Sequence, residues 1–347
     1  MVRVIGIDPG TKSFDFCGLD DDDVILDRSV STGDILKEPD LISDMIIKTR
    51  AEFVVGPSGY GIPVAAISDI GERELFLMSL IKKGDKKSFL GMRKSINRLK
   101  KNRLPVYFIP GVIHLPTVPD HRKINKVDMG TADKLCCAAL GVRDQALRDN
   151  KNYSETSFIM LEMGFGYTAA IAVKDGKIID GVGGSSGNIG YISMGSMDAE
   201  LAYLLGGFDK ELIFRGGVAT ISPDPDGLMD NSDALSAYLE GAVKDVLSLT
   251  ASVRPEEILV SGRMSKVRGL FDDLKGRLEP FNVRKLEGFS DVKVKEAAQG
   301  AAIIANGLAG GKYEELINVM EIRQARGTSL DHILLPEIET IKKEYGI

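Results

Sequence analysis

The stretch VIGIDPGTKS, residues 4–13, decides the fold of this chain. Its first half is a short β-branched run, which predicts a buried strand that ends at Asp8. Gly10 then opens a turn in which backbone N–H groups can approach a phosphate, and Asp8 can hold a magnesium ion directly or through water. Further donors to a nucleotide are expected from the turn residues Thr11, Lys12 and Ser13. Taken alone, the pattern is also that of an ordinary hairpin.

The second half of the chain repeats this arrangement. Phe158–Leu161 is an apolar run that predicts a strand, Glu162 follows it, and a glycine-bearing turn leads into a second predicted strand, Ala169–Val173. Because the repeat distance is far longer than that of a solenoid, the pattern predicts duplicated domains. The two hairpins are expected to grip the β- and γ-phosphates of one nucleotide from both sides. In the second turn the expected contacts are Gly164, Gly166, Tyr167 and Thr168.

The chain length also predicts two lobes, because single cores stop growing at roughly 250 to 300 residues and this chain has 347. A predicted linker at residues 149–152 divides the chain into a first lobe, residues 1–150, and a second lobe, residues 151–347. The last helices are expected to pack back on the first lobe.

The composition excludes several classes of protein. With 44% hydrophobic and 27% charged residues the chain is expected to be globular, and a net charge of -6 argues against a nucleic-acid partner. We expect no export signal and no membrane partner, hence a cytoplasmic protein. A helical region is predicted from about Glu72 to Lys101, and the basic stretch Lys82–Arg103 predicts a solvated helical face, with an anion-facing or partner-facing surface as the alternative. Cys17, Cys136 and Cys137 lack metal-type spacing and are expected to be buried thiols.

The paired acidic turns resemble those of the acetate and sugar kinase/actin-like ATPase superfamily. Val4–Ser13 matches the first hairpin of that superfamily, and Phe158–Val173 matches the second, with Glu162 where most members have aspartate. The resemblance implies an α/β fold of two duplicated ribonuclease-H-like (actin-like ATPase) lobes with a nucleotide cleft between them. It also implies ATP and Mg²⁺ as cofactors, with Asp8 and Glu162 as catalytic residues that organise the metal.

The resemblance extends to a late glycine turn and to two linking helices. Residues 258–264 match the turn that contacts adenosine, and the expected contacts are Ser261, Gly262 and Arg263. Arg263 stands where family members often have a second glycine, and a plain helix entry is the alternative. Residues 128–140 and 297–311 resemble the linking helices, whose small residues permit close packing at the hinge.

The acceptor side of the expected site is less specific. Asp128 and Asp133 stand beside a predicted helix N-terminus, where Asp128 is either a cap or a third catalytic residue that orients the acceptor oxygen or a metal-bound water. Acceptor contacts are expected from the loops 57–63, 110–127 and 183–195. The candidate cations are not ranked: they are Lys12, Arg122, Lys123, Lys134 and Arg215.

Over nearly its whole length the chain is most similar to an uncharacterised, mainly archaeal family known as predicted butyrate kinases. The implied function is ATP-dependent phosphoryl transfer to a small acceptor, with a short-chain carboxylate as the candidate, although the arginine and histidine pattern of acetate kinases is not recognisable. Two alternatives stay open: an actin-like or chaperone-like ATPase switch, and a catalytically inactive nucleotide-binding protein. Related kinases often dimerise, so a homodimer is a further expectation.

Overall fold

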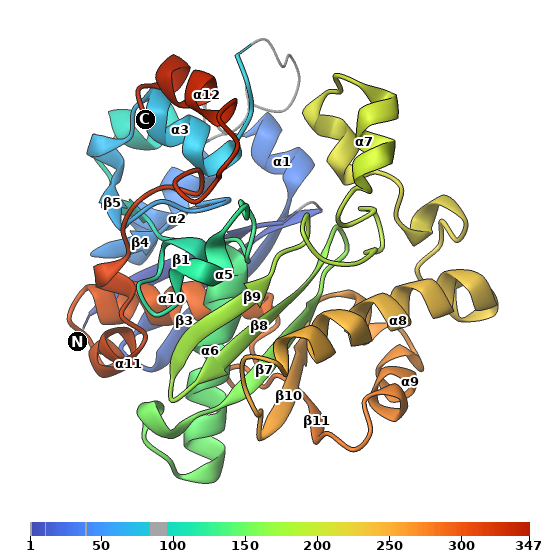
Figure 1. Cartoon of the computed structure of the whole chain (residues 1–347). Helices are drawn as coiled ribbons and strands as arrows, with labels where there is room; N and C mark the ends of the chain where they lie inside the picture. Colours follow the sequence, from blue (N-terminus) through green and yellow to red (C-terminus); the bar gives the residue numbers. More distant parts are fainter. Residues whose placement is uncertain (1, 11, 39, 84–95) are drawn as a thin grey trace.

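Two α/β lobes make up the computed structural model, which describes residues 2–10, 12–38, 40–83 and 96–347 (Figure 1). The first sheet has the strand order β3-β2-β1-β4-β6-β5. Strands β1 to β3 are antiparallel neighbours, and β4 and β6 continue the sheet parallel to β1. The strand bounds are β1 (Arg3–Pro9), β2 (Ser13–Asp20), β3 (Asp23–Ser31), β4 (Phe53–Val55), β5 (Ala65–Ala66) and β6 (Val106–Phe108).

The second sheet repeats this topology in the order β11-β10-β7-β8-β9. Strands β7 to β9 form the antiparallel part, and β10 and β11 continue it parallel to β7. The bounds are β7 (Phe158–Met163), β8 (Thr168–Lys174), β9 (Lys177–Val182), β10 (Glu257–Ser261) and β11 (Val283–Lys285). The predicted fold of two duplicated lobes is therefore confirmed.

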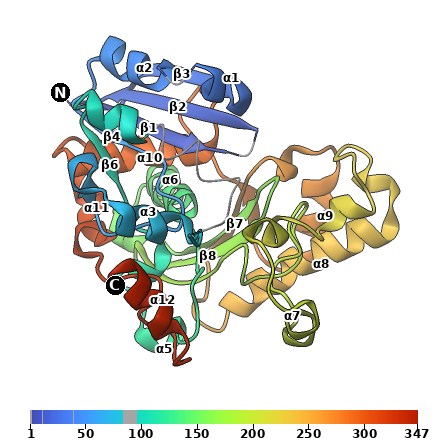
Figure 2. The same cartoon turned by 90° about the horizontal axis from the view of Figure 1, so that it is seen from above.

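Two helices lie between the sheets, α6 (Ala132–Asp149) and α10 (Glu296–Leu308), and they pack against each other (Figure 2). Helix α6 follows the first sheet along the chain but packs on β7 and β8 of the second, whereas α10 follows the second sheet and packs on β1 and β2 of the first. Small residues permit the close approach: a Cβ atom at Gly6 would lie 2.1 Å from the backbone nitrogen of Ala302. Each half of the sequence thus covers the sheet of the other half.

Among the other helices, α8 packs on β7, β8 and β9 of the second sheet, and α11 packs on α10. The C-terminal helix α12 lies beside α3 of the first lobe, where the ring of Tyr345 stacks on Phe76 with the centroids 3.6 Å apart (Figure 1). The helix bounds are α1 (Thr32–Lys37), α2 (Leu41–Thr49), α3 (Glu72–Ser79), α5 (Asp120–Lys123), α7 (Ala199–Leu205), α8 (Ser232–Leu249), α9 (Leu270–Arg277), α11 (Glu314–Val319) and α12 (Ile338–Tyr345). Short 3-10 turns occupy residues 67–69, 112–114, 153–155, 210–214, 218–220, 228–230, 264–266 and 322–324.

One predicted helix, from about Glu72 to Lys101, is wrong in its extent. Helix α3 ends at Ser79 because Leu80 adopts the left-handed region, with φ 51°, and residues 96–101 are helical again. The prediction for the basic stretch falls partly on residues 84–95, which lie outside the described residues.

Burial agrees with the prediction for the thiols. Cys17, Cys136 and Cys137 are all buried and free, and burial raises the pKa of each thiol, that of Cys17 to about 12. In the part of the chain that the structure describes, no helix is both long and apolar enough to cross a membrane.

Candidate active site

A cavity of about 500 Å³ is lined by residues of both lobes. Five segments meet there: the two glycine hairpins, the starts of α6 and α10, and the turn after β10. The cavity-lining residues among those expected to bind nucleotide are Gly10, Lys12, Ser13, Gly164, Gly166, Tyr167, Gly262 and Arg263. The acids Asp8, Asp128, Asp133 and Glu162 also line it, so the structure brings these expected site residues together.

In the first hairpin, two carboxylates share one lysine. Asp8 near the end of β1 pairs in register with Asp15 of β2, and both side chains are buried. The Nζ atom of Lys295 lies 3.1 Å from Oδ2 of Asp8 and 2.8 Å from Oδ2 of Asp15, and it donates a hydrogen bond of 3.2 Å to the carbonyl oxygen of Ser13. Lys295 is the N-cap residue of α10 and comes from the other half of the sequence.

The second hairpin has the same arrangement. Near the end of β7, Oε2 of Glu162 lies 2.8 Å from Nζ of Lys134, and this ammonium group also lies 2.6 Å from Oδ2 of Asp133. The hydroxyl group of Thr131 donates a further short hydrogen bond to Asp133. Lys134 and Asp133 belong to the first turn of α6, so a lysine at the start of a crossing helix again contacts the acid of a hairpin.

Burial raises the pKa values of three acids in this cluster, and the neighbouring ammonium groups lower them. Burial raises the pKa of Asp8 and of Glu162, an effect that the nearby ammonium groups of Lys295 and Lys134 only partly offset. Burial would also raise the pKa of Asp133, but Lys134 and the hydrogen bonds bring it below its ordinary value. The same pairs raise the pKa of Lys134 well above its ordinary value despite burial. Both lysines therefore stay cationic at neutral pH.

The charges of this cluster suit a divalent cation. Four carboxylates, those of Asp8, Asp15, Asp133 and Glu162, and two ammonium groups leave a formal charge of 2 − 4 = −2. Among the described residues, no set of three or more Asp, Glu, His or Cys side chains is arranged to hold a metal ion alone. Mg²⁺ does not require one, because it commonly uses one or two protein carboxylates together with waters and phosphate oxygens. The donor set of Asp8 and Glu162 therefore fits Mg²⁺.

Two further cations in the cavity lie against an aromatic ring. Nζ of Lys12, from the first lobe, is 4.0 Å from the ring centroid of Phe165 in the second, and Cζ of Arg263 is 5.4 Å from it. Arg263 follows Gly262, whose φ of 91° and whose close approach to Met163 exclude a side chain, since a Cβ atom would lie 2.4 Å from the carbonyl oxygen of Met163. This turn therefore presents backbone and a cation to the cavity.

Asp128 is held firmly by the neighbouring loop. Its carboxylate accepts hydrogen bonds from the backbone nitrogen of Gly130 at 3.0 Å, the backbone nitrogen of Ser185 at 3.0 Å and the hydroxyl of Ser185 at 2.8 Å. An apolar wall in the same cavity is made of Tyr60, Met78, Tyr167 and Phe214.

Lys210 of the second lobe crosses to this wall. Its Nζ lies 3.4 Å from the hydroxyl of Tyr60 in the first lobe. Burial, followed by the charge of Asp128, raises the pKa of Tyr60, which keeps its phenol neutral.

Some expected contacts do not reach the cavity. Ser261 is buried in β10 with its hydroxyl 3.6 Å from the sulfur of Met160, and Thr168 is buried at the start of β8. Neither lines the cavity, and Thr11 lies outside the described residues. Of the three expected acceptor loops, 57–63 and 183–195 reach the cavity through Ser58, Gly59, Tyr60 and Gly184.

The third expected acceptor loop, 110–127, packs elsewhere. Arg122 of this loop donates to the carbonyl oxygen of Ile179 in β9 and pairs with Asp180. No described residue of the loop lines the cavity, so Arg122 and Lys123 drop out as candidate cations there.

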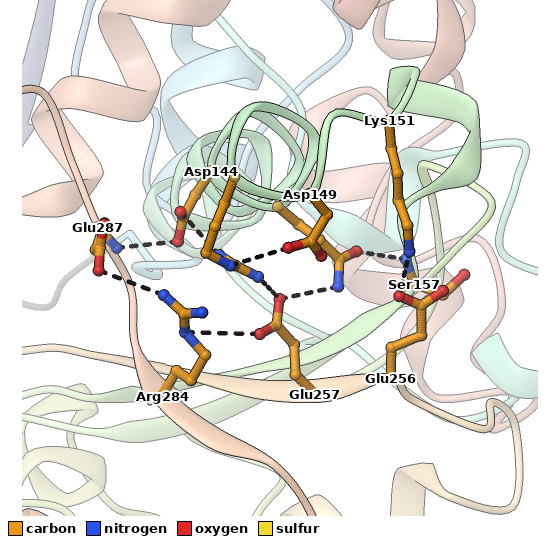
Figure 3. A network of polar contacts seen from close by, with 10 residues as sticks. Asp144, Asp149, Lys151, Ser157, Glu256, Glu257, Arg284 and Glu287 are labelled. Atoms are coloured by element: carbon orange, nitrogen blue, oxygen red, sulfur yellow. Dashed lines mark hydrogen bonds and ion pairs between the residues drawn. The ribbon is translucent and has the colours of Figure 1, made fainter.

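The far end of α6 is tied to the second sheet by a polar network (Figure 3). Arg148 forms ion pairs with Asp144, at 3.0 Å, and with the buried Glu257 of β10. Gln145 donates to Glu257 at 2.9 Å and accepts from the backbone nitrogen of Ser157 at 2.8 Å. Since α6 carries Asp133 and Lys134 at its other end, this network fixes those side chains relative to the second sheet.

Solved structures of similar fold include three short-chain carboxylate kinases. The acetate kinase from Porphyromonas gingivalis has 13% identity and a TM-score of 0.57, with 87% of this chain and 98% of that chain covered. A propionate kinase from Francisella tularensis has 12% identity and a TM-score of 0.58, with the same coverage. The acetate kinase from Entamoeba histolytica has 14% identity and a TM-score of 0.56, with 80% and 87% covered.

Identities this low show a common fold and nothing more. No curated protein sequence matches the chain. A family profile described as "Protein of unknown function (DUF1464)" matches residues 6–335, and the chain therefore belongs to the DUF1464 family.

Proposed function

We propose that this protein is an ATP-dependent phosphotransferase that uses Mg²⁺ and acts on a small acceptor. The observation that carries the proposal is that two glycine hairpins, one from each lobe, present Asp8 and Glu162 to the same cavity. The fold shared with proteins named acetate kinase and propionate kinase supports it. Phosphoryl transfer depends mainly on positioning and charge neutralisation, which a cavity with paired acids and cations supplies.

Each part of the cavity has a role in this proposal. Asp8 and Glu162 hold Mg²⁺, which neutralises charge on the phosphate oxygens when it is bound. The backbone at Gly10, Gly164 and Gly166 cradles the phosphates, while Gly262 and Arg263 lie against the adenosine. In the reaction the bond between the γ-phosphorus and the β–γ bridging oxygen breaks, ADP leaves with that electron pair, and the acceptor oxygen forms the new bond.

Asp128 bears on the kind of acceptor. A hydroxyl acceptor must lose a proton, so it requires a base with a free carboxylate oxygen. Oδ2 of Asp128 accepts both hydrogen bonds from Ser185 and Oδ1 accepts one from Gly130, which orients the carboxylate and leaves a lone pair on Oδ1 toward an acceptor. A carboxylate acceptor has no proton to lose at neutral pH. We propose a short-chain carboxylate such as butyrate, because Tyr60, Tyr167 and Phe214 line the cavity and offer an apolar surface to its alkyl chain.

The test is ADP formation from ATP and Mg²⁺ by the purified protein, with short-chain carboxylates, sugars or no acceptor. Asp8→Asn should lower turnover by about a hundredfold or more, because it removes charge at the proposed metal site. Asp20→Asn is the matched control, since it removes a carboxylate at the end of β2 away from the cavity, where Asp20 pairs with Arg3 and does not line the cavity. Thermal unfolding of each variant verifies the fold.

The outcomes separate the candidate functions. ADP formation that requires a carboxylate and is lost in Asp8→Asn supports the proposal, whereas full turnover in Asp8→Asn contradicts the metal role. Slow ATP hydrolysis that ignores every acceptor would favour an ATPase switch. ATP binding without any turnover would favour an inactive nucleotide-binding protein.

A further inference from the structure

The two lysines of the cavity occupy equivalent places in the duplicated fold. Lys134 stands in the first turn of α6 and Lys295 at the N-cap of α10, the two helices that cross between the sheets. Each contacts the acid of the hairpin on whose sheet its helix packs: Lys134 contacts Glu162, and Lys295 contacts Asp8. Both ion pairs join residues from opposite halves of the sequence.

Each lysine is held on the lobe whose acid it contacts. The network at the far end of α6 ties the helix of Lys134 to β7 and β10 (Figure 3). On the other side, Asp27 of β3 accepts hydrogen bonds from the backbone nitrogens of Lys293 and Val294, directly before Lys295. Each ammonium group therefore moves with the hairpin beside it when the lobes shift relative to each other.

The position of Lys295 coincides with the place where a phosphate would approach the first turn. A Cβ atom at Gly10 would lie 2.1 Å from Nζ of Lys295, so the ammonium group lies directly against the turn. A lysine has three donors on a flexible stem, and it can exchange a carboxylate for a phosphate oxygen by rotating side-chain bonds. The same carboxylates are the proposed ligands of Mg²⁺, so metal and ammonium compete for them.

We infer that Lys134 and Lys295 are a matched pair of catalytic cations: when magnesium ATP binds, they release Glu162 and Asp8 and donate to oxygens of the transferred phosphoryl group from opposite sides. The inference rests on the proposed function. Both lysines keep their protons throughout, and no bond other than hydrogen bonds changes at them. In the free protein they hold the acids in place, and in the complex they neutralise charge that develops during transfer.

Metal binding by the free protein is the first test. Because the ammonium groups compete with the metal for the carboxylates, removing a lysine should strengthen metal binding. Lys134→Met and Lys295→Met should each bind Mn²⁺, used as a spectroscopic substitute for Mg²⁺, roughly tenfold more tightly or better, since an ammonium that opposes the metal is gone. Lys266→Met is the matched control. Lys266 lines the same cavity but pairs with Glu296, at 2.9 Å, and should leave Mn²⁺ affinity nearly unchanged.

Turnover should change in the opposite direction. In both Met variants kcat should fall by about a hundredfold, because each loses a donor to the transferred group. Tighter metal binding together with slower transfer supports the inference. Weaker or unchanged Mn²⁺ binding overturns it, because a lysine that serves only to organise the carboxylates would weaken the metal site on removal.

A second measurement, on the wild-type protein, tests the inference if the Met variants do not fold. Ammonium signals of Lys134 and Lys295 in ¹⁵N NMR spectra of the wild-type protein, assigned with Lys134→Arg and Lys295→Arg, should both shift when Mg²⁺ and a nonhydrolysable ATP analogue are added. Unshifted signals overturn the inference. Neither binding measurement requires an acceptor. If the lysines move from the carboxylates to phosphate oxygens but no phosphate is transferred, the proposed kinase activity is refuted and the binding role of the two lysines stands.

Discussion

His114 is a buried base whose protonation state differs between the folded and unfolded chain. Its side chain is buried, and Nδ1 lies 3.3 Å from the carbonyl oxygen of Gly111. Burial lowers the pKa of His114 to about 4, against the hydrogen bond to Gly111 and the charge of Asp331, while Lys123 and His332 add to the lowering. An unfolded histidine has a pKa near 6.5. Between those values the unfolded chain binds a proton that the folded chain does not.

The consequence is a pH-dependent loss of stability on the acid side. This histidine costs almost no stability well above pH 6.5, and the free energy of unfolding that it removes grows as the pH drops toward 4, reaching about 2 to 3 kcal/mol at pH 4.5. His114→Gln lacks the titrating group. Urea unfolding at pH 7.5 and pH 4.5 should therefore show a smaller loss of unfolding free energy for the variant than for the wild type. Equal losses in the two proteins would show that His114 does not contribute.

At the scale of single residues, the sequence predicted the acids better than the cations. Asp8 and Glu162 were predicted because strand, acid and glycine follow each other locally. Lys295 was missed because it lies 287 positions from Asp8, and only the crossing of α10 brings it there. Asp15 had a local signal that was overlooked, since a tight hairpin pairs it with Asp8.

At the scale of the elements, the close packing of α6 on α10 depends on glycine at the contact between them. Gly300 of α10 lies on Cys136 of α6, where a Cβ atom would be 1.9 Å from the carbonyl oxygen of Cys136. Gly141 of α6 lies against the ring of Phe158 in β7 in the same way, at 2.7 Å. Backbone cannot yield as a flexible side chain does, so the contact at Gly300 leaves no space for a methyl group.

Gly300→Ala should therefore lower the free energy of unfolding by about 1 to 3 kcal/mol or more, as overpacked cores do. Gly276→Ala provides the control in α9, because a Cβ atom there meets nothing within 4 Å. Alanine has the higher helix propensity, so the control should gain up to about 1 kcal/mol. Chemical denaturation of both variants measures the difference, and a neutral Gly300→Ala would contradict the close packing of α6 on α10.

The sequence predicted most elements but not their partners. Apolar and β-branched runs predict β1, β7 and β8, because those patterns are local. The hydrophobic periodicity of a helix shows which face is buried but not which sheet that face packs on. The exchange of α6 and α10 between the lobes is therefore not predictable from it. Helix α3 was predicted too long because Leu80, which is neither glycine nor asparagine, ends it in the left-handed region.

At the scale of the whole molecule, the proposed nucleotide would contact both lobes, because residues of both line the cavity, and would stabilise them together. Magnesium ATP at about 100 times its dissociation constant should add about 2.7 kcal/mol to the free energy of unfolding. Hydrogen exchange should slow in both hairpins at once, around Gly10 and around Gly164, since both line the cavity. Protection confined to one hairpin would contradict a shared nucleotide site.

The crossing of α6 and α10 also limits how the molecule can be divided. A polypeptide cut at residue 150 would leave each fragment with a helix whose sheet is in the other fragment and a sheet without its helix. Neither piece would be an autonomous folding unit, although the two together have every contact of the intact chain. A half-length ancestor could have covered its sheet by exchanging this helix with a second copy. Gene fusion would then have made an intermolecular exchange permanent within one chain.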